Sequence, residues 1–371
     1  MLLAPVLLLS AAHFAPADHE PPVQRSQNVV LVLIDGLRWQ EVFSGADETM
    51  MNKENGGVED VAGIRKAFWR DTGEQRRAAL MPFLWSTGTK QGQIYGNKTL
   101  AAPAQVTNNF HFSYPGYSEM ICGFADPAIN SNAARPNKNV SVFEWLHSKP
   151  DFKGRVATFG AWETVNAIIN KDRCGFPVFS GLDPVNVGFI SGAQATLNKV
   201  KAETQWPWGT EPYDSVTFYS ALEYLKANRP RAMWITFGET DEFAHEGRYD
   251  HYLNAAHNTD KWLGELWSTL QSYDQYRGRT TMIVAVDHGR GNAPKDWMNH
   301  GVTHPGSNDI WVAIIGPDVS PRGEMRDVTL VTQSQIAATV ASAVGEDFCA
   351  ENPKAAKPIR FSIKSKQPAL R

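Results

Sequence analysis

Short unbroken runs of apolar residues constrain the fold of this chain more than any other feature of its sequence. The clearest runs span residues 28–34, 155–159, 232–237, 281–286 and 310–315. Because their apolar residues are continuous rather than alternating, each run is typical of a strand buried on both faces of a parallel sheet. Helical spacing of apolar residues lies between the runs, at 140–149, 215–228, about 252–273 and 330–344. Strands that alternate with helices predict an α/β sandwich with a mostly parallel sheet.

The composition is that of a globular protein, with 42% hydrophobic and 20% charged residues among 371. A formal net charge of -3 gives no basic surface that would indicate a nucleic-acid partner. No internal repeat or low-complexity linker divides the sequence, so we expect one domain over residues 18–371. The odd number of cysteines, Cys122, Cys174 and Cys349, allows one disulfide and one free thiol, and their spacing is not that of a zinc ribbon. Nothing in the sequence indicates an oligomeric state.

The N-terminus has the pattern of an export signal. Residues 1–12 are nearly all apolar, and Ala15-Pro16-Ala17 gives the small-x-small pattern that a signal peptidase needs. The apolar run is too short to span a bilayer, so no transmembrane anchor is indicated. No Lys or Arg precedes the run, and a buried N-terminal strand is the alternative. We expect residues 1–17 to be a signal peptide and the mature protein to be periplasmic or secreted.

Two polar segments fit the strand-helix alternation poorly. Residues 45–85 are rich in Arg and Glu, and residues 170–212 carry many Gly, Pro and Trp residues. Segments of this kind are typical of cap insertions that select a substrate over the edge of a sheet. Ordinary surface loops explain them equally well.

Acidic residues and histidines recur where the apolar runs end. In a parallel α/β sheet the carboxyl ends of the strands line the ligand crevice, so these side chains should converge on one edge. Carboxylate and imidazole ligands suit a divalent metal, zinc above all. Each residue alone is more typical of a turn or a helix cap, and only the conjunction indicates a metal site. The residues are Asp35, Asp241, His245, Asp287, His288 and His304.

A nucleophile candidate stands in a loop that enters a predicted helix. Ser113 is followed by Tyr114-Pro115-Gly116 and then by helix-forming residues. The N-terminus of such a helix would present backbone N–H groups to an anion. A serine oxygen becomes a good nucleophile when a metal lowers its pKa. The alternative role of Ser113 is a helix N-cap.

The order of these acidic residues, Ser113 and the histidines along the chain resembles the order of site residues in the alkaline phosphatase superfamily. Residues 33–38 (LIDGLR) resemble the opening of its nucleotide pyrophosphatase/phosphodiesterase branch, and residues 113–116 (SYPG) resemble that branch's nucleophile turn, which usually carries Thr. Residues 286–289 (VDHG) resemble the superfamily's Asp-His pair, and residues 304–307 (HPGS) resemble the last ligand segment of alkaline phosphatases. The resemblance spans residues 28 to about 345 and implies a three-layer α/β sandwich with cap insertions.

The resemblance also implies two divalent ions, most simply Zn²⁺ with Mn²⁺ as the alternative. One ion would be bound by Asp241, His245 and His304, with His300 as an alternative to His304. The other would be bound by Asp35, Asp287 and His288 together with Ser113. Ser113 would then form a covalent phosphoenzyme, which a metal-activated water would hydrolyse.

Binding of the phosphate needs further hydrogen-bond donors, because the ligand charges already cancel those of two divalent ions. The phosphodiesterase branch supplies an Asn about twenty residues after its nucleophile. Asn130 and Asn132 lie near that distance here, and Asn132 is preferred. Arg290 is a second candidate for substrate binding.

The sequence therefore indicates an exported hydrolase of small-molecule phosphate esters, with monoesters, diesters and phosphonates left open. Sulfatases of the same superfamily are the nearest rival, but their nucleophile motif has Arg at its fifth position, where this chain has Tyr117. Phosphoglycerate mutases of the superfamily carry a large inserted domain that this chain lacks the length to hold. A non-catalytic metal-binding relic is the remaining alternative, and metal content would separate it from an enzyme.

Overall fold

The computed structural model describes residues 25–361 of the chain, so the expected signal peptide at 1–17 lies outside the described residues. An eight-stranded sheet has the order β5-β4-β6-β1-β7-β8-β2-β9. The strands are β1 (Asn28–Ile34), β2 (Gly92–Tyr95), β4 (Val156–Gly160), β5 (Val178–Ser180), β6 (Ala232–Phe237), β7 (Thr280–Val286), β8 (Val312–Ile315) and β9 (Gly323–Glu324). A separate pair joins β3 (Ala104–Gln105) to β10 (Val331–Thr332).

The central strands are parallel, as the unbroken apolar runs predict. β1 pairs in parallel with β6 on one side and with β7 on the other, and every residue of β1 is buried. The run at 310–315 is a strand, but the prediction that it is parallel is wrong, because β8 runs antiparallel to both β7 and β2. A parallel neighbour would need a crossover connection, usually a helix, between β7 and β8. The chain has only an irregular loop there, and it returns antiparallel beside β7.

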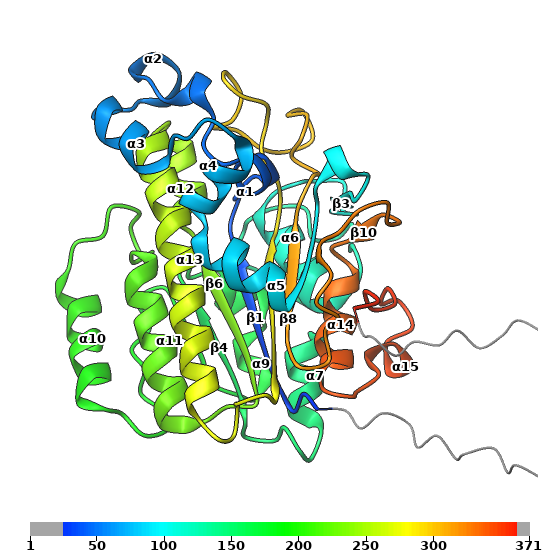
Figure 1. Ribbon diagram of the computed structural model, residues 1–371. Coiled ribbons are helices and arrows are strands. Elements are labelled where there is room, and N and C mark those ends of the chain that lie inside the picture. The colour runs from blue at the N-terminus through cyan, green and yellow to red at the C-terminus, as the bar shows by residue number, and fades with distance from the viewer. Residues whose placement is uncertain (1–24, 362–371) are drawn as a thin grey trace, which may run out of the picture.

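Helices cover both faces of this sheet, which confirms the three-layer α/β sandwich. Figure 1 shows α10 (Gly192–Glu203), α11 (Asp214–Asn228) and α13 (Tyr249–Ser272) on one side. On the other side lie α7 (Val142–Ser148), α14 (Gln335–Ala343) and α15 (Phe348–Glu351). The predicted helices at 140–149, 215–228, 252–273 and 330–344 correspond to α7, α11, α13 and α14 within a few residues at each end.

Shorter helices connect these layers. They are α1 (Trp39–Ser44), η1 (Glu48–Met50), α2 (Lys53–Gly56), α3 (Val61–Phe68), α4 (Gly73–Leu80), the π-helical turn η2 (Leu84–Gly88), α5 (Thr89–Gln91), η3 (Lys98–Leu100), α6 (Ser113–Cys122), α8 (Val165–Ile168), α9 (Lys171–Cys174) and α12 (Glu239–His245).

The two polar segments occupy different places in this fold. Residues 45–85 form η1, α2, α3 and α4, which lie at the same end of the molecule as α1 and α12 (Figure 1). Residues 170–212 include β5, the edge strand of the sheet, so this segment belongs partly to the sandwich itself. All three cysteines are free thiols. None of the helices in residues 25–361 has the length and apolar character that a membrane span requires.

Candidate metal centre and nucleophile

Three neighbouring strands deliver acidic side chains to one edge of the sheet. Asp35 directly follows β1, Asp287 directly follows β7, and Asp241 lies in the first turn of α12 after β6. Gly36 adopts a positive φ of 60° behind Asp35, and a Cβ there would lie 2.7 Å from the Asp241 carboxylate. The turn after β1 therefore depends on glycine both for its backbone conformation and for space.

The first ligand group consists of Asp35, Asp287 and His288, all buried. His288 Nε2 lies 3.2 Å from Asp35 Oδ1 and 3.2 Å from Asp287 Oδ2. The His288 Nδ1–H donates to the Gly289 carbonyl at 2.9 Å, which leaves Nε2 as a ligand atom. The Tyr117 hydroxyl donates to Asp35 Oδ2 at 3.0 Å and so orients that carboxylate.

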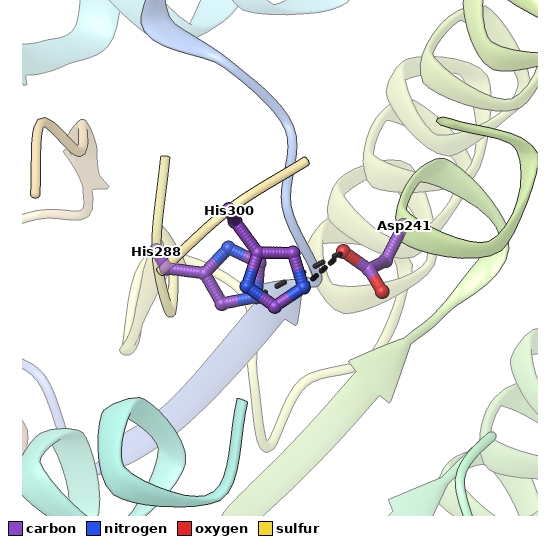
Figure 2. Close-up of side chains that lie close together, drawn as sticks. All are labelled: Asp241, His288 and His300. Atoms are coloured by element: carbon purple, nitrogen blue, oxygen red, sulfur yellow. Dashed lines mark ion pairs between the residues drawn. The ribbon is translucent and has the colours of Figure 1, made fainter. Parts of the chain in front are cut away.

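The second group consists of Asp241, His288 and His300, so His288 belongs to both groups, and His245 lies beside this second group. His245 Nε2 lies 3.0 Å from Asp241 Oδ2 and 3.1 Å from His300 Nε2. His300 Nδ1–H donates to the His111 carbonyl at 3.3 Å, so its Nε2 also faces the group. Figure 2 shows the His288 and His300 rings face to face, both directed toward Asp241, and their centroids are 4.0 Å apart. The two groups are therefore continuous.

The sequence-based preference for His304 over His300 does not agree with this arrangement. His304 belongs to neither ligand group, and its Nδ1 pairs with Asp296 Oδ1 at 2.8 Å. Both histidines lie in the irregular segment between β7 and β8, where no periodicity predicts which ring points inward. His300 is the residue that the structure brings to Asp241.

The chemistry of these residues fits divalent cations. Asp35 Oδ1 and Asp287 Oδ2 are buried and have no hydrogen-bond partner among the described residues. Burial, followed by the charge of Asp241, raises the pKa of Asp35 to about 7, and burial and Asp35 raise the pKa of Asp287. Burial lowers the pKa of His288 to about 4, which leaves its imidazole neutral. Crowded buried carboxylates beside neutral imidazoles match the donor set of a zinc site.

Ser113 is the first residue of α6 and lies beside both groups. Its Oγ is 3.5 Å from His288 Nε2, and the residue is 6% exposed. Helix α6 can approach this closely because residue 116 is glycine: a Cβ there would lie 2.5 Å from the Asp287 carbonyl oxygen. The sequence predicted a helix N-terminus near Ser113, but it expected a loop through Pro115-Gly116 before the helix, whereas the helix begins at Ser113 itself.

Asn132 approaches the same helix terminus. Its Oδ1 accepts from the Tyr114 N–H at 3.0 Å, and among residues 25–361 no group accepts from its amide Nδ2, which can therefore donate to a ligand. Asn132 lines a cavity of about 220 Å³ together with Ser113, whereas Asn130 lines a neighbouring hollow. The arrangement agrees with the preference for Asn132 over Asn130.

Arg290 does not reach the cavity. It is fully buried, and its guanidinium donates to the Asp241 carboxylate and to the carbonyls of Trp297 and Met298. Although burial acts in the opposite direction, the Arg290 charge holds the pKa of Asp241 well below its usual range. Its contacts indicate that Arg290 positions Asp241, and in this structure it does not line the cavity that a substrate contact would have to reach.

Besides Gly238, sequence reasoning missed three residues whose side chains line the cavity, namely Trp162, Glu211 and Glu242. Trp162 follows the end of β4 by two residues, and Glu242 follows Asp241, so the strand-end argument could have found both. Glu211 lies in the 170–212 segment, where the sequence has no apolar periodicity that could predict which side chains point toward the cavity.

Solved structures share this fold. A protein of the alkaline phosphatase superfamily from Vibrio parahaemolyticus matches with a TM-score of 0.50 and 16% identity, over 87% of this chain and 67% of that one. The alkaline phosphatase PafA matches with a TM-score of 0.57 and 11% identity, over 93% and 100%. A 2-O GAG sulfatase matches with a TM-score of 0.58 and 12% identity, over 90% and 73%. No family model and no curated protein matches the sequence. The chain thus has the alkaline phosphatase-like fold that its motifs predict.

Proposed function

We propose that this chain is an exported metallohydrolase that cleaves phosphate esters of small molecules, with Ser113 as its nucleophile. The observation that carries the proposal is the position of Ser113 Oγ, 3.5 Å from His288, at the point where two groups of ligand side chains meet in one cavity. Export rests on the apolar run at residues 1–12 and on Ala15-Pro16-Ala17.

Two divalent ions, most simply Zn²⁺, are the proposed cofactors. Asp35, Asp287, His288 and Ser113 would hold one of them. The other would be held by Asp241, His245 and His300. When bound, such ions supply positive charge that lowers the pKa of a serine hydroxyl and stabilises negative charge on the reacting oxygens.

Ser113 and its neighbours would carry the reaction in two steps. The Ser113 oxygen attacks phosphorus, a new O–P bond forms, and the bond to the leaving alcohol breaks, which gives a phosphoserine. Water then attacks the phosphoserine and releases phosphate, or a phosphate monoester when the substrate is a diester. The free Asn132 amide is suited to donate to a phosphoryl oxygen, because its carbonyl oxygen is already held by Tyr114 N–H.

Sulfate ester hydrolysis is the second candidate, and the fold similarity to a 2-O GAG sulfatase favours it as much as the similarity to PafA favours phosphate. The sequence argues for phosphate. Sulfatases of this superfamily oxidise their nucleophile within a motif that has Arg where this chain has Tyr117. Here Tyr117 is buried and hydrogen-bonded to Asp35, so that position is already committed to the metal-ligand group.

The experiment that tests the proposal compares three substrates with the same leaving group: p-nitrophenyl phosphate, a p-nitrophenyl phosphodiester and p-nitrophenyl sulfate. Zinc-loaded protein should cleave at least one phosphate ester well ahead of the sulfate, as judged by kcat/KM. A sulfatase rate above both phosphate rates would overturn the proposal, and so would no turnover of any of the three by protein that holds two ions per chain.

A further inference from the structure

The carboxyl group of Glu211 lacks a partner inside the cavity. Glu211 is 6% exposed, precedes α11 and lines the same cavity as Ser113. Among residues 25–361, none donates a hydrogen bond to its side chain. The backbone N–H of Glu211 donates to the Trp208 carbonyl at 3.4 Å and so does not bind the carboxyl group either. A buried carboxylate without a donor or a counter-charge is costly, so a ligand that supplies both would bind there favourably.

The local backbone makes room for this side chain. A Cβ on Gly238 would lie 1.8 Å from Glu211 Oε1, so the turn after β6 admits the carboxyl group only because residue 238 is glycine. The nearby Asp214 carboxylate, in contrast, is already satisfied. It accepts from the Gly238 and Glu239 N–H groups at 2.8 and 2.9 Å. Outside the ligand groups, Glu211 and Glu242 are therefore the acidic lining residues left for a ligand, and Glu211 is the more buried of the two.

The charges of the cavity call for a cation other than the two proposed metal ions. Three ligand carboxylates and the Ser113 oxygen, once deprotonated, balance two divalent ions. Glu211 and Glu242 are carboxyl groups in excess of that balance, and the lining residues in the described part of the chain include no Lys or Arg. Burial raises the pKa of Glu211 well above its ordinary value, so a bound cation would stabilise its charged form. An anionic leaving group would be repelled by this wall. Glu211 also lies in neither of the two ligand groups, which argues against a metal ion as its partner.

An organic ammonium group fits this site. Its N–H bonds would satisfy the unpaired Glu211 oxygens, and its charge would offset the surplus of carboxylates. Trp162, half-buried in the same lining, offers an aromatic ring that attracts a cation. We propose that the natural substrate is a phosphate ester whose alcohol carries an ammonium group, and that Glu211 binds this group. The substrate class rests on the proposed hydrolase function, whereas the ammonium subsite can be tested without turnover.

The test measures binding of a matched pair of phosphonates to zinc-loaded, full-length protein by calorimetry. The probes are 2-aminoethylphosphonate and n-propylphosphonate, which differ by an ammonium group in place of a methyl group. The ammonium compound should bind at least ~10-fold more tightly, a difference of about 1.4 kcal/mol. Equal binding would overturn the subsite and leave the phosphate site standing. If neither compound binds, both proposals fall.

A pair of variants assigns the preference to one residue. Glu211→Gln keeps the size of the side chain and removes its charge, so it should reduce the affinity ratio of the two phosphonates at least ~10-fold. Glu203→Gln, on the exposed face of α10, is the matched control and should keep the wild-type ratio. If Glu211→Gln fails to fold, the affinity ratio of the two phosphonates for the wild type still tests whether an ammonium subsite exists. A third metal ion in the wild type that Glu211→Gln loses would assign Glu211 to a metal and overturn the inference.

Turnover separates this inference from the proposed function. Phosphate release from phosphoethanolamine and from n-propyl phosphate should show the same preference as the phosphonates. A phosphonate preference without hydrolysis of either ester would uphold the ammonium subsite and refute the hydrolase. Equal hydrolysis of both esters, together with equal phosphonate binding, would uphold the hydrolase and refute the subsite.

Discussion

Replacement of His300 by Ala should remove one metal ion from the centre, while replacement of His304 should not. His300 Nε2 lies 3.1 Å from His245 Nε2 and 3.8 Å from Asp241 Oδ1, and only 12% of its side chain is exposed. Without His300, the group at Asp241 would retain two of its three protein ligands. The ring of His304 is instead paired with Asp296, and 29% of its side chain is exposed.

The expected loss of metal affinity in each variant depends on whether the removed imidazole ring is a metal ligand. Loss of a residue that only supports a ligand typically costs 10–100-fold in metal affinity, so loss of a ligand itself should cost at least ~100-fold, or about 2.7 kcal/mol. His304→Ala removes one partly exposed pair, worth ~1 kcal/mol or less, and that pair does not touch a ligand group. Its effect on metal affinity should stay below ~5-fold.

The assay is zinc competition against a chromophoric chelator, with elemental analysis of the protein afterwards. Wild type and His304→Ala should retain two ions per chain, and His300→Ala should retain one at the same chelator concentration. Retention of both ions by His300→Ala together with loss of one by His304→Ala would refute the reasoning and restore the sequence-based preference.

Three further predictions concern the nucleophile, the packing and the electrostatics. Ser113→Ala should lower kcat on a phosphate ester at least ~10³-fold, or roughly 4 kcal/mol of barrier, with both ions retained, whereas Ser118→Ala, five residues along the same helix, should cost far less. Gly116→Ala should lower the free energy of unfolding in urea by about 1–3 kcal/mol, because its Cβ would lie 2.5 Å from the Asp287 carbonyl oxygen, and an unchanged midpoint would argue against this close contact. Burial raises the pKa of Asp260 from an ordinary value near 3.8 to about 7. The folded state therefore binds more protons there, and this residue's contribution to stability, fully present below about pH 4, should be lost as pH rises toward 7, by at most about 1.4 kcal/mol per pH unit. Urea unfolding of Asp260→Asn across that window should show a weaker fall of stability with pH than the wild type, and parallel curves would contradict the assignment.

The sequence predicted the central strands because a strand that is buried on both faces is apolar along its whole length. The runs that became β1, β6 and β7 are apolar throughout, and Asp35 and Asp287 directly follow two of them. Strand direction cannot be predicted from apolar residues in this way. β8 is as apolar as β7, and its antiparallel pairing depends on the path of the preceding loop.

Parts of the site that depend on irregular backbone were harder to predict. His300 and His304 are four residues apart in a loop, so composition could not tell which one faces Asp241. Arg290 has the charge expected of a phosphate ligand, and only its complete burial against Asp241 assigns it a positioning role. Glu211 is distant in sequence from every motif and reaches the cavity only through the turn that precedes α11.

The proposed phosphoryl transfer passes through Ser113, and identification of a trapped intermediate can show where the phosphoryl group is bound. Zinc-loaded protein would be mixed with a fast-leaving phosphate ester, quenched in acid within the first turnover, digested, and analysed by mass spectrometry. We expect one phosphorylated peptide with the modification on Ser113, and no phosphopeptide from Ser113→Ala under the same conditions. A phosphoryl group on another residue, or rapid turnover by Ser113→Ala at wild-type rates, would contradict it.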